Sequence, residues 1–284
     1  MDILNYTVEK EAFENNLGSF YYVANKTTGE KCVLLKISDA LKDEKYLNQV
    51  LGVVNKGNKS VPGVLFMRSF VKDGEEWYGE YEYFEGKPMS FVMSQKRSST
   101  IIKQMLSSLA TSLDGLTEAG VSYGGLTPES VICCVDGSYK IIGPEFYNTE
   151  YKLEGNEDIY NSGYADPKAV DLKFTNKNDV YSLARFTATM FLAEKFYTSK
   201  DYPIPDIATL KPIQASIDQA VKTEEKFNSC GDFVNSLVDF KGSCPFIDHG
   251  SQVATYWYVV VVVLIIILDW CANTYGWFGG SLGG

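Results

Sequence analysis

The first third of the chain consists of short apolar runs separated by turn-forming Asn, Asp and Gly residues. Such runs occur at residues 20–23, 32–37 and 64–67. Their length and their boundaries are typical of β-strands. One helix is expected among these strands, at 39–55, because its apolar residues recur at helical spacing. These residues are Leu47, Val50, Leu51 and Val54.

From Ser98 onward the apolar pattern becomes helical. A long amphipathic helix is predicted first, and its apolar stripe contains Ile101, Ile102, Met105, Leu106, Leu109, Leu113 and Leu116. Two β-rich runs follow at 131–135 and 139–142. The Asp-Gly-Ser sequence between them predicts a hairpin.

Helical patterns return at 178–196 and again between 212 and 240. A small strand-rich part is thus followed by a larger helical part, with the hairpin between them. We expect an α+β fold with two lobes, at residues 1–83 and 84–242.

A strongly apolar segment lies near the C-terminus. The run from Tyr256 to Leu268 is uninterrupted, and the segment reaches the roughly 20 residues of a membrane-spanning helix if Asp269 lies at the lipid headgroups. Aromatic residues flank the run on both sides, as an interfacial belt requires. We expect a linker at 243–252, a transmembrane helix at 253–272 and a short tail at 273–284. A buried strand or core helix would also fit the uninterrupted run.

The distribution of charge gives this segment an orientation. Every Lys and Arg precedes Leu268, and the N-terminus has neither the basic region nor the apolar run of a signal peptide. We therefore expect a single-pass, tail-anchored membrane protein whose large N-terminal part faces the cytosol.

Composition excludes several classes of function. The formal net charge is -10 and the pI is about 4.8, which argues against nucleic acid as a partner because phosphate binding requires clustered cations. The six cysteines show no C-x-x-C spacing, and the single histidine is His249. We therefore expect reduced thiols and no metal site.

The order of these segments resembles the protein kinase fold, and several segments match motifs of that family in register. In the first lobe, 33–36 resembles the strand with the lysine that binds the nucleotide phosphates, and 82–86 resembles the hinge, with Tyr81 in the gatekeeper place. The segment 123–131 matches the catalytic loop H-R-D-L-K-P-E-N-I, and 139–145 matches the strand that ends in D-F-G. The remaining matches are 164–168 (A-P-E), 177–183 (the floor helix of the large lobe) and 223–227 (the last conserved block).

The departures from these motifs bear on catalysis. Gly125 replaces the catalytic-loop aspartate, and Thr127 replaces the lysine beside the transferred phosphate. Ser130 and Gly143 replace the two metal-binding residues, an asparagine and the D-F-G aspartate. Single transition-state stabilisers contribute about 3–4 kcal/mol each, and phosphoryl transfer depends on positioning and metal ions. The resemblance therefore implies a degenerate kinase, or pseudokinase, with no bound metal and no catalytic residue.

The resemblance also implies an eroded nucleotide site. Lys36, Glu44 and Glu82 are the residues that would support weak, metal-independent ATP binding. Lys36 and Glu44 also fit a purely structural pair that holds the helix without a ligand. Only Gly18 is left of the glycine-rich phosphate loop.

Two further expectations follow from the resemblance and concern structure. Asp179 should hydrogen-bond to the backbone of the catalytic loop. Lys168 and Lys226 stand where the family has a glutamate–arginine pair, so that brace should be rebuilt or absent.

Three functions remain open on the sequence. The first is a regulatory or scaffolding pseudokinase at a membrane, whose partners are proteins such as an active kinase or subunits of a membrane complex. Its tyrosines near the activation-loop equivalent, Tyr147, Tyr151, Tyr160 and Tyr164, would serve as phosphorylation sites or interface anchors, or are simply common in this chain.

The second function is an atypical or residual phosphotransferase that holds metal through Glu129, Glu145 or Asp136. The third is a passive structural subunit of a membrane complex.

Overall fold

The computed structural model describes residues 2–3, 5–55, 60–93, 99–147, 163–166, 174–192, 211–222 and 226–237. Contacts divide the chain into two units, Met1–Gly242 and Ser243–Gly284, and every described residue belongs to the first unit.

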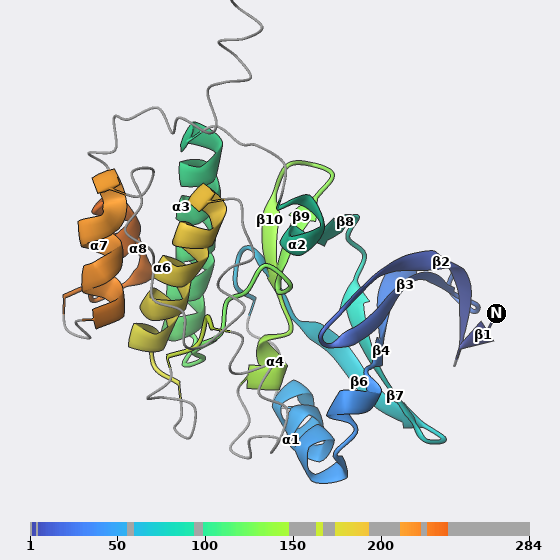
Figure 1. Cartoon of the computed structure of the whole chain (residues 1–284). Helices are drawn as coiled ribbons and strands as arrows, with labels where there is room; N and C mark the ends of the chain where they lie inside the picture. Colours follow the sequence, from blue (N-terminus) through green and yellow to red (C-terminus); the bar gives the residue numbers. More distant parts are fainter. Residues whose placement is uncertain are drawn as a thin grey trace, which may run out of the picture. The chain divides into compact units, whose positions relative to one another are not determined.

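The N-terminal lobe is built on an antiparallel sheet with the strand order β1-β2-β3-β4-β7-β6 (Figure 1). Side chains alternate between the two faces of each strand, so neighbouring residues of a strand belong to different layers of the lobe. The strands are β1 (Asp2–Ile3), β2 (Tyr6–Asn15), β3 (Gly18–Asn25), β4 (Lys31–Ile37), β6 (Met67–Asp73) and β7 (Glu76–Glu82).

The helix predicted among these strands is confirmed. It consists of the short 3-10 helix η1 (Asp39–Leu41) and of α1 (Glu44–Asn55). The side of α1 that packs against the protein carries Tyr46, Leu47, Val50 and Val54, all buried.

A second, small sheet joins the two lobes. Its strand order is β5-β10-β9-β8, where β10 pairs with β9 as the predicted hairpin and runs parallel to β5. The bounds of its strands are β5 (Val64–Leu65), β8 (Gly86–Pro88), β9 (Val131–Cys134) and β10 (Tyr139–Ile142). Figure 1 shows this sheet between the large sheet and the helices of the C-terminal lobe.

The C-terminal lobe is helical. Its helices are α2 (Met89–Val92), α3 (Ser99–Glu118), α4 (Pro144–Tyr147), α6 (Asn176–Leu192), α7 (Lys211–Lys222) and α8 (Cys230–Asn235). The long helix predicted after Ser98 is α3, and α6 packs against it. The region predicted as helical between 212 and 240 forms α7 and α8 in its described part.

Helix α8 is attached to α3 by one carboxylate. The Asp114 side chain accepts hydrogen bonds from the backbone N–H groups of Cys230 and Gly231, at 2.8 and 2.9 Å. These are donors that a helix N-terminus leaves without intrahelical partners. Asp114 therefore caps α8 across the lobe.

Within the described residues, no helix has the length and hydrophobicity required to cross a membrane. The predicted linker, transmembrane helix and tail at 243–284 lie outside the described part of the chain.

Candidate functional site

The candidate site is the place where nucleotide binds in the fold that the sequence resembles. Its upper wall, on the side of the N-terminal lobe, is the turn between β2 and β3 together with one face of the large sheet. Its lower wall, on the side of the C-terminal lobe, is the loop at 123–130 with Gly143 and α4. The chain between β7 and β8 connects the two walls at the rear.

Lys36 does not face this site. Lys36 pairs in register with Ser19 on β3 and Tyr78 on β7, whereas Val33 pairs with Tyr81. Two of the side chains on the Lys36 face, Leu34 and Cys32, pack with Val23 and Tyr78 in a separate cluster. Because strand faces alternate, Lys36 lies on the face opposite to Tyr81.

The predicted pair of Lys36 with Glu44 is wrong. Lys36 Nζ lies 3.2 Å from Glu76 Oε1, and Glu44 Oε1 lies 3.1 Å from Lys72 Nζ. Glu44 is the first residue of α1 and its side chain is 73% exposed. The residue next to Lys36 that faces the site is Leu35, which is fully buried.

Glu82 also lies apart from the site. Its carboxylate, which is 49% exposed, forms an ion pair with Lys140 of β10 at 3.2 Å. The side chains of Lys36, Glu44 and Glu82 thus each have a different cationic or anionic partner, and the structure does not bring them together.

Aromatic rings fill the upper part of the site. Phe13 stacks on Phe20 with ring centroids 4.5 Å apart. The Phe13 ring centroid also lies 6.3 Å from that of Phe84, a residue of the hinge. Phe20 lies 6.2 Å from Tyr81. All four side chains are buried, so the protein's own rings pack together in this part of the site.

The turn between β2 and β3 belongs to the upper wall, but it extends the Leu17 side chain to the lower wall of the site. The Leu17 side chain is 1% exposed. Its carbonyl accepts a hydrogen bond from the backbone N–H of Ser38 at 2.8 Å, and its own N–H donates to Asn15 Oδ1 at 2.9 Å. Gly18 is required next, because its φ is +141° and a β-carbon there would lie 2.0 Å from the carbonyl oxygen of Lys36.

Leu17 lies against Gly143, the position of the D-F-G aspartate. Gly143 has a φ of +75°, and a β-carbon added to it would lie 2.8 Å from Leu17 Cδ1. That separation is too short for two carbon atoms. Leu17 therefore occupies the space in which a side chain at position 143 would begin.

The same turn is bonded to the opposite lobe. Asn15 Nδ2 donates a hydrogen bond to the backbone carbonyl of Glu129 at 3.1 Å. Glu129 belongs to the catalytic-loop equivalent, so this contact and the Leu17–Gly143 contact connect the two lobes across the front of the site.

Thr127 and Ser130 are turned toward their own loop. The Ser130 hydroxyl accepts from Thr127 N–H at 2.9 Å and donates to the Thr127 carbonyl at 3.0 Å. The Thr127 hydroxyl accepts from the N–H groups of Glu129 and Ser130 at 3.2 and 3.3 Å. Both side chains are buried, and their hydrogen-bonding capacity is used to close the loop.

The loop at 123–130 is also fixed by Asp179 of α6. Asp179 Oδ1 accepts a hydrogen bond from Gly124 N–H at 2.5 Å, and Asp179 is fully buried. Burial raises the pKa of Asp179 to about 8, although the Gly124 and Tyr123 backbone N–H groups lower it. Tyr123, in the place of the H-R-D histidine, donates to the Ile142 carbonyl at 2.7 Å.

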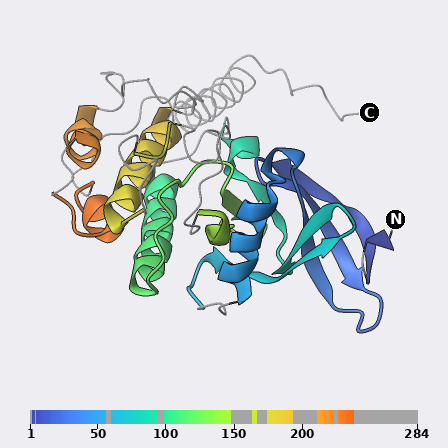
Figure 2. The same cartoon turned by 90° about the horizontal axis from the view of Figure 1, so that it is seen from below.

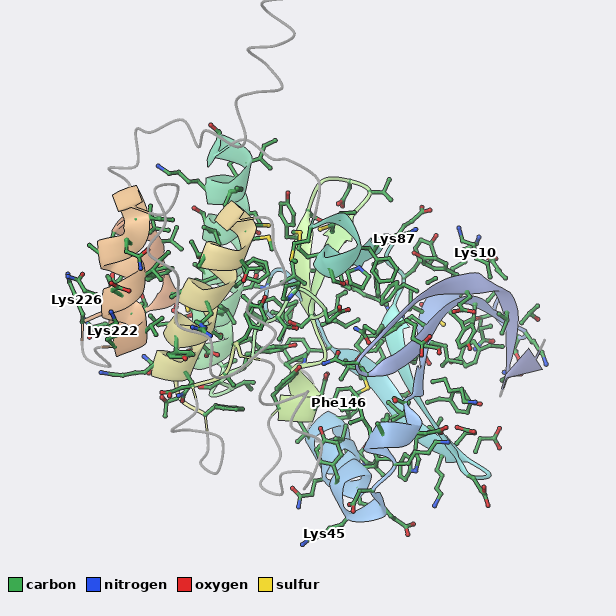
Figure 3. All side chains as sticks on the ribbon, in the orientation of Figure 1. Lys10, Lys45, Lys87, Phe146, Lys222 and Lys226 are labelled. Atoms are coloured by element: carbon green, nitrogen blue, oxygen red, sulfur yellow. The ribbon has the colours of Figure 1, made fainter. Side chains whose placement is uncertain are left out.

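Helix α4 begins directly after Gly143 and is held by the N-terminal lobe. Glu145 Oε1 accepts a hydrogen bond from Met67 N–H at 2.7 Å, and Tyr46 of α1 donates to the Phe146 carbonyl at 2.7 Å. Figure 2 shows α4 beside α1, and Figure 3 labels Phe146 on α4. The first contact joins β6 to the lower wall, and the second joins α1 to it.

Glu145, the second residue of α4, has a carboxyl group that is completely buried. Its second oxygen, Oε2, and the nearby Tyr81 hydroxyl have no hydrogen-bond partner. Burial raises the pKa of Glu145 from 4.5 to about 7, against a lowering by the backbone N–H groups of Glu145 and Met67.

The acidic residues considered as replacement metal ligands lie in different surroundings. Glu145 is directed toward Met67, while Asp136 accepts hydrogen bonds from Ser138 in the exposed β9–β10 turn. Within the described ranges, no three His, Cys, Asp or Glu side chains form a group able to hold a metal ion.

Two of the four tyrosines near the activation-loop equivalent are described, and both are buried. Tyr147 lies 4.4 Å from Tyr123, ring centre to ring centre, and the Tyr164 hydroxyl lies 3.0 Å from the Thr189 hydroxyl. Tyr151, Tyr160 and Lys168 lie outside the described residues, and Lys226 is hydrogen-bonded to Gln219.

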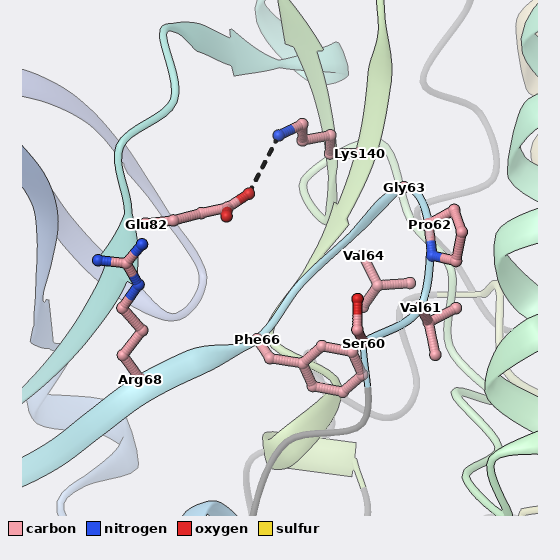
Figure 4. A pocket seen from close by; sticks show the side chains of 9 residues that line it. All are labelled: Ser60, Val61, Pro62, Gly63, Val64, Phe66, Arg68, Glu82 and Lys140. Atoms are coloured by element: carbon pink, nitrogen blue, oxygen red, sulfur yellow. Dashed lines mark hydrogen bonds and ion pairs between the residues drawn. The ribbon is translucent and has the colours of Figure 1, made fainter.

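A pocket of about 360 Å³ lies behind the hinge, on the side of β7 that carries the Glu82 side chain (Figure 4). It is bordered by the chain leading into β6, by the end of β7 and by β10. Its lining residues are Ser60, Val61, Pro62, Gly63, Val64, Phe66, Arg68, Glu82 and Lys140.

Comparison of structures supports the fold and not a closer relationship. The chain is similar to two variants of the PknI kinase domain of Mycobacterium tuberculosis, with TM-scores of 0.66 and 0.64 and sequence identities of 15% and 14%. The matches cover 84% and 85% of this chain and 96% and 98% of those domains. No protein-family model and no curated protein matches the sequence. The chain has a protein-kinase-like fold.

Sequence reasoning missed the residues that close the site. Leu17, Asn15 and Tyr46 carry no motif, and their roles depend on contacts with residues far away in the chain. One local signal was available for Leu17: an apolar residue between Asn16 and Gly18 in a tight turn is unexpected on an exposed loop.

Proposed function

We propose that this chain is a catalytically inactive kinase-like protein that acts by binding other proteins as a membrane-tethered regulator or scaffold. The observation that carries the proposal is the occupation of the site by the protein's own side chains. Aromatic rings stand in the upper part, and Leu17 stands against Gly143 in the lower part.

Three features of the site support the absence of phosphoryl transfer. Leu35 takes the site-facing place beside Lys36, so no lysine stands at this point of β4 to grip phosphates. The hydroxyls of Thr127 and Ser130 satisfy their own loop. Gly125 and Gly143 offer no carboxylate for the acceptor or for Mg²⁺.

The proposal of a scaffold rests on the rigidity that these contacts give. Asn15, Leu17, Tyr46 and Glu145 each connect the N-terminal lobe to the loop or helix below it. A domain whose two lobes are fixed in one arrangement presents a constant surface to a partner. An active kinase or a subunit of a membrane complex is the partner class we propose.

The membrane tether is proposed from the sequence at 253–272. Alkaline extraction of membranes from cells that express the full chain tests it directly. We expect the full chain to stay in the membrane pellet and a variant without residues 253–272 to be released. Release of both would contradict the tether.

The catalytic part is tested by transfer of radiolabelled γ-phosphate to the full chain and to generic substrates, with Mg²⁺ or Mn²⁺. We expect no incorporation above that of a heat-denatured sample. Metal-dependent labelling that is abolished by Glu129→Ala or Glu145→Ala would instead establish an enzyme with rerouted ligands.

A further inference from the structure

The pocket behind the hinge is a place, within the described residues, where a small ligand could contact both lobes. Val61, Pro62 and Phe66 approach it from the N-terminal lobe, and Lys140 approaches it from β10. Its volume of about 360 Å³ falls within the range of small-molecule sites. The site described above, by contrast, is filled by side chains of the protein itself.

One half of the pocket is apolar and well supported. The loop that carries Val61 and Pro62 is fixed to α3, since the Ser112 hydroxyl donates to the Pro62 carbonyl at 3.0 Å. The next residue, Gly63, accepts a hydrogen bond from the backbone N–H of Ile141 at 2.8 Å. Parallel pairing of β5 with β10 then fixes Val64. This wall is therefore preformed, which lowers the entropic cost of binding.

The other half of the pocket carries charge, with two cations and one anion in its lining. Figure 4 shows Arg68, Glu82 and Lys140 at the same end of the pocket. Lys140 is paired with Glu82 at 3.2 Å, and Arg68 is paired with Glu30, which lies outside the lining, at 2.8 Å. Glu82 is 49% exposed and Lys140 is 26% exposed, so Glu82 can turn into solvent more readily than Lys140 can.

We infer that this pocket binds an amphipathic anion, a carboxylate or phosphate head on a small aromatic or aliphatic body. The head would replace Glu82 beside Lys140 and Arg68, and the body would lie on Pro62 and Phe66. A cationic head would instead meet two cations and a single carboxylate. Such a ligand would contact both lobes from behind the hinge. On the other side of the hinge, Leu17 closes the site between the lobes.

Thermal unfolding of the full chain in a non-ionic detergent, with small probes, tests the inference. The probes are phenylacetate and phenyl phosphate, with the neutral isostere phenylacetamide as the control ligand. We expect a saturable rise in Tm with one or both anions and none with the amide. The two anions distinguish a carboxylate ligand from a phosphate ligand. No response to either anion, or an equal response to the amide, overturns the inference.

A matched pair of variants locates the binding. Lys140→Met removes the cation in the pocket, and Lys36→Met removes a lysine from an ion pair of the same length, 3.2 Å, outside it. We expect Lys140→Met to weaken the apparent affinity for the anion about tenfold or more and Lys36→Met to leave it unchanged. Equal affinity in the two variants overturns the inference.

A second measurement does not depend on the stability of the variants. Hydrogen exchange of the native chain, with and without the effective anion, should show added protection in peptides that cover residues 60–68 and 139–142. Protection elsewhere with none in these two segments also overturns the inference.

Discussion

Leu17 Cδ1 lies 2.8 Å from the point where a β-carbon at position 143 would be, so a larger residue there would require the Leu17 side chain to move. The glycine at position 143 is therefore coupled to the placement of the β2–β3 turn. An aspartate at position 143 would meet the Leu17 side chain at its β-carbon and would carry the strain of a φ of +75°.

The coupling between these two residues predicts an unusual cost for Gly143→Ala. Gly137 provides the control, because its φ of +83° is close to the +75° of Gly143 but a β-carbon there meets nothing within 4 Å. Both alanine variants carry the strain of a positive φ, and only Gly143→Ala adds overpacking, at about 1–3 kcal/mol. Urea denaturation of both variants measures the difference. Equal losses would show that Leu17 does not press on position 143.

The hydrogen bond that attaches α1 predicts a contrast between two buried tyrosines. Tyr46 donates to the Phe146 carbonyl at 2.7 Å, whereas the Tyr81 hydroxyl has no partner. Tyr46→Phe should cost about 1–3 kcal/mol because a buried carbonyl loses its donor, and Tyr81→Phe should be neutral or stabilising. Chemical denaturation compares the two. A larger loss for Tyr81→Phe would contradict this arrangement of α1 and α4.

The register of β4 predicts that Lys36 matters less for stability than its neighbour. Lys36 and Glu76 are 37% and 31% exposed as an ion pair, so Lys36→Met should cost less than about 1 kcal/mol. Leu35 is fully buried, and Leu35→Ala should cost about 2–5 kcal/mol. Denaturant midpoints of the two variants check this order, and the reverse order would indicate that Lys36 faces the interior.

Within the described residues, the expectations from sequence were correct for the helices and strands and failed for the faces on which some side chains lie. Apolar periodicity placed α1 and α3, and the Asp-Gly turn placed the β9–β10 hairpin, because each is determined by contacts near in sequence. The face of Lys36 depends on the pairing of β4 with β3 and β7, and a difference of one residue moves a side chain to the opposite face. A match to the kinase lysine motif contains no information about that register.

The acidic residues show the same limit. The position of Glu44 at the start of a helix predicts a partner for Lys36, yet the interior side of α1 begins with Tyr46. Glu145 was considered as a metal ligand because of its closeness to Gly143 in the sequence, and the structure buries it against Met67 instead. Its surroundings come from β6 and β7, which are far away along the chain.

The buried Glu145 predicts a dependence of stability on pH. Its folded-state pKa is raised from 4.5 to about 7, so the folded state favours the protonated carboxyl. The associated stability is complete below pH 4.5 and is lost as the pH rises through about 7. Within this window the unfolding free energy should fall by about 1.4 kcal/mol per pH unit on account of this group.

Glu145→Gln is the matched variant for this effect, because the amide keeps the shape and cannot ionise. Unfolding free energies of both proteins between pH 5 and pH 7 give the two slopes. We expect the slope of the variant to be less negative by the contribution of one carboxyl group. Parallel curves would show that Glu145 does not titrate in this range.

We propose that the protein's own side chains occupy the place of Mg²⁺ and ATP. Isothermal titration of Mg·ATP into the full chain measures this directly. We predict no saturable heat up to nucleotide concentrations of about 1 mM, which corresponds to a binding free energy weaker than about -4 kcal/mol. Stoichiometric binding that disappears when Mg²⁺ is chelated would contradict the account.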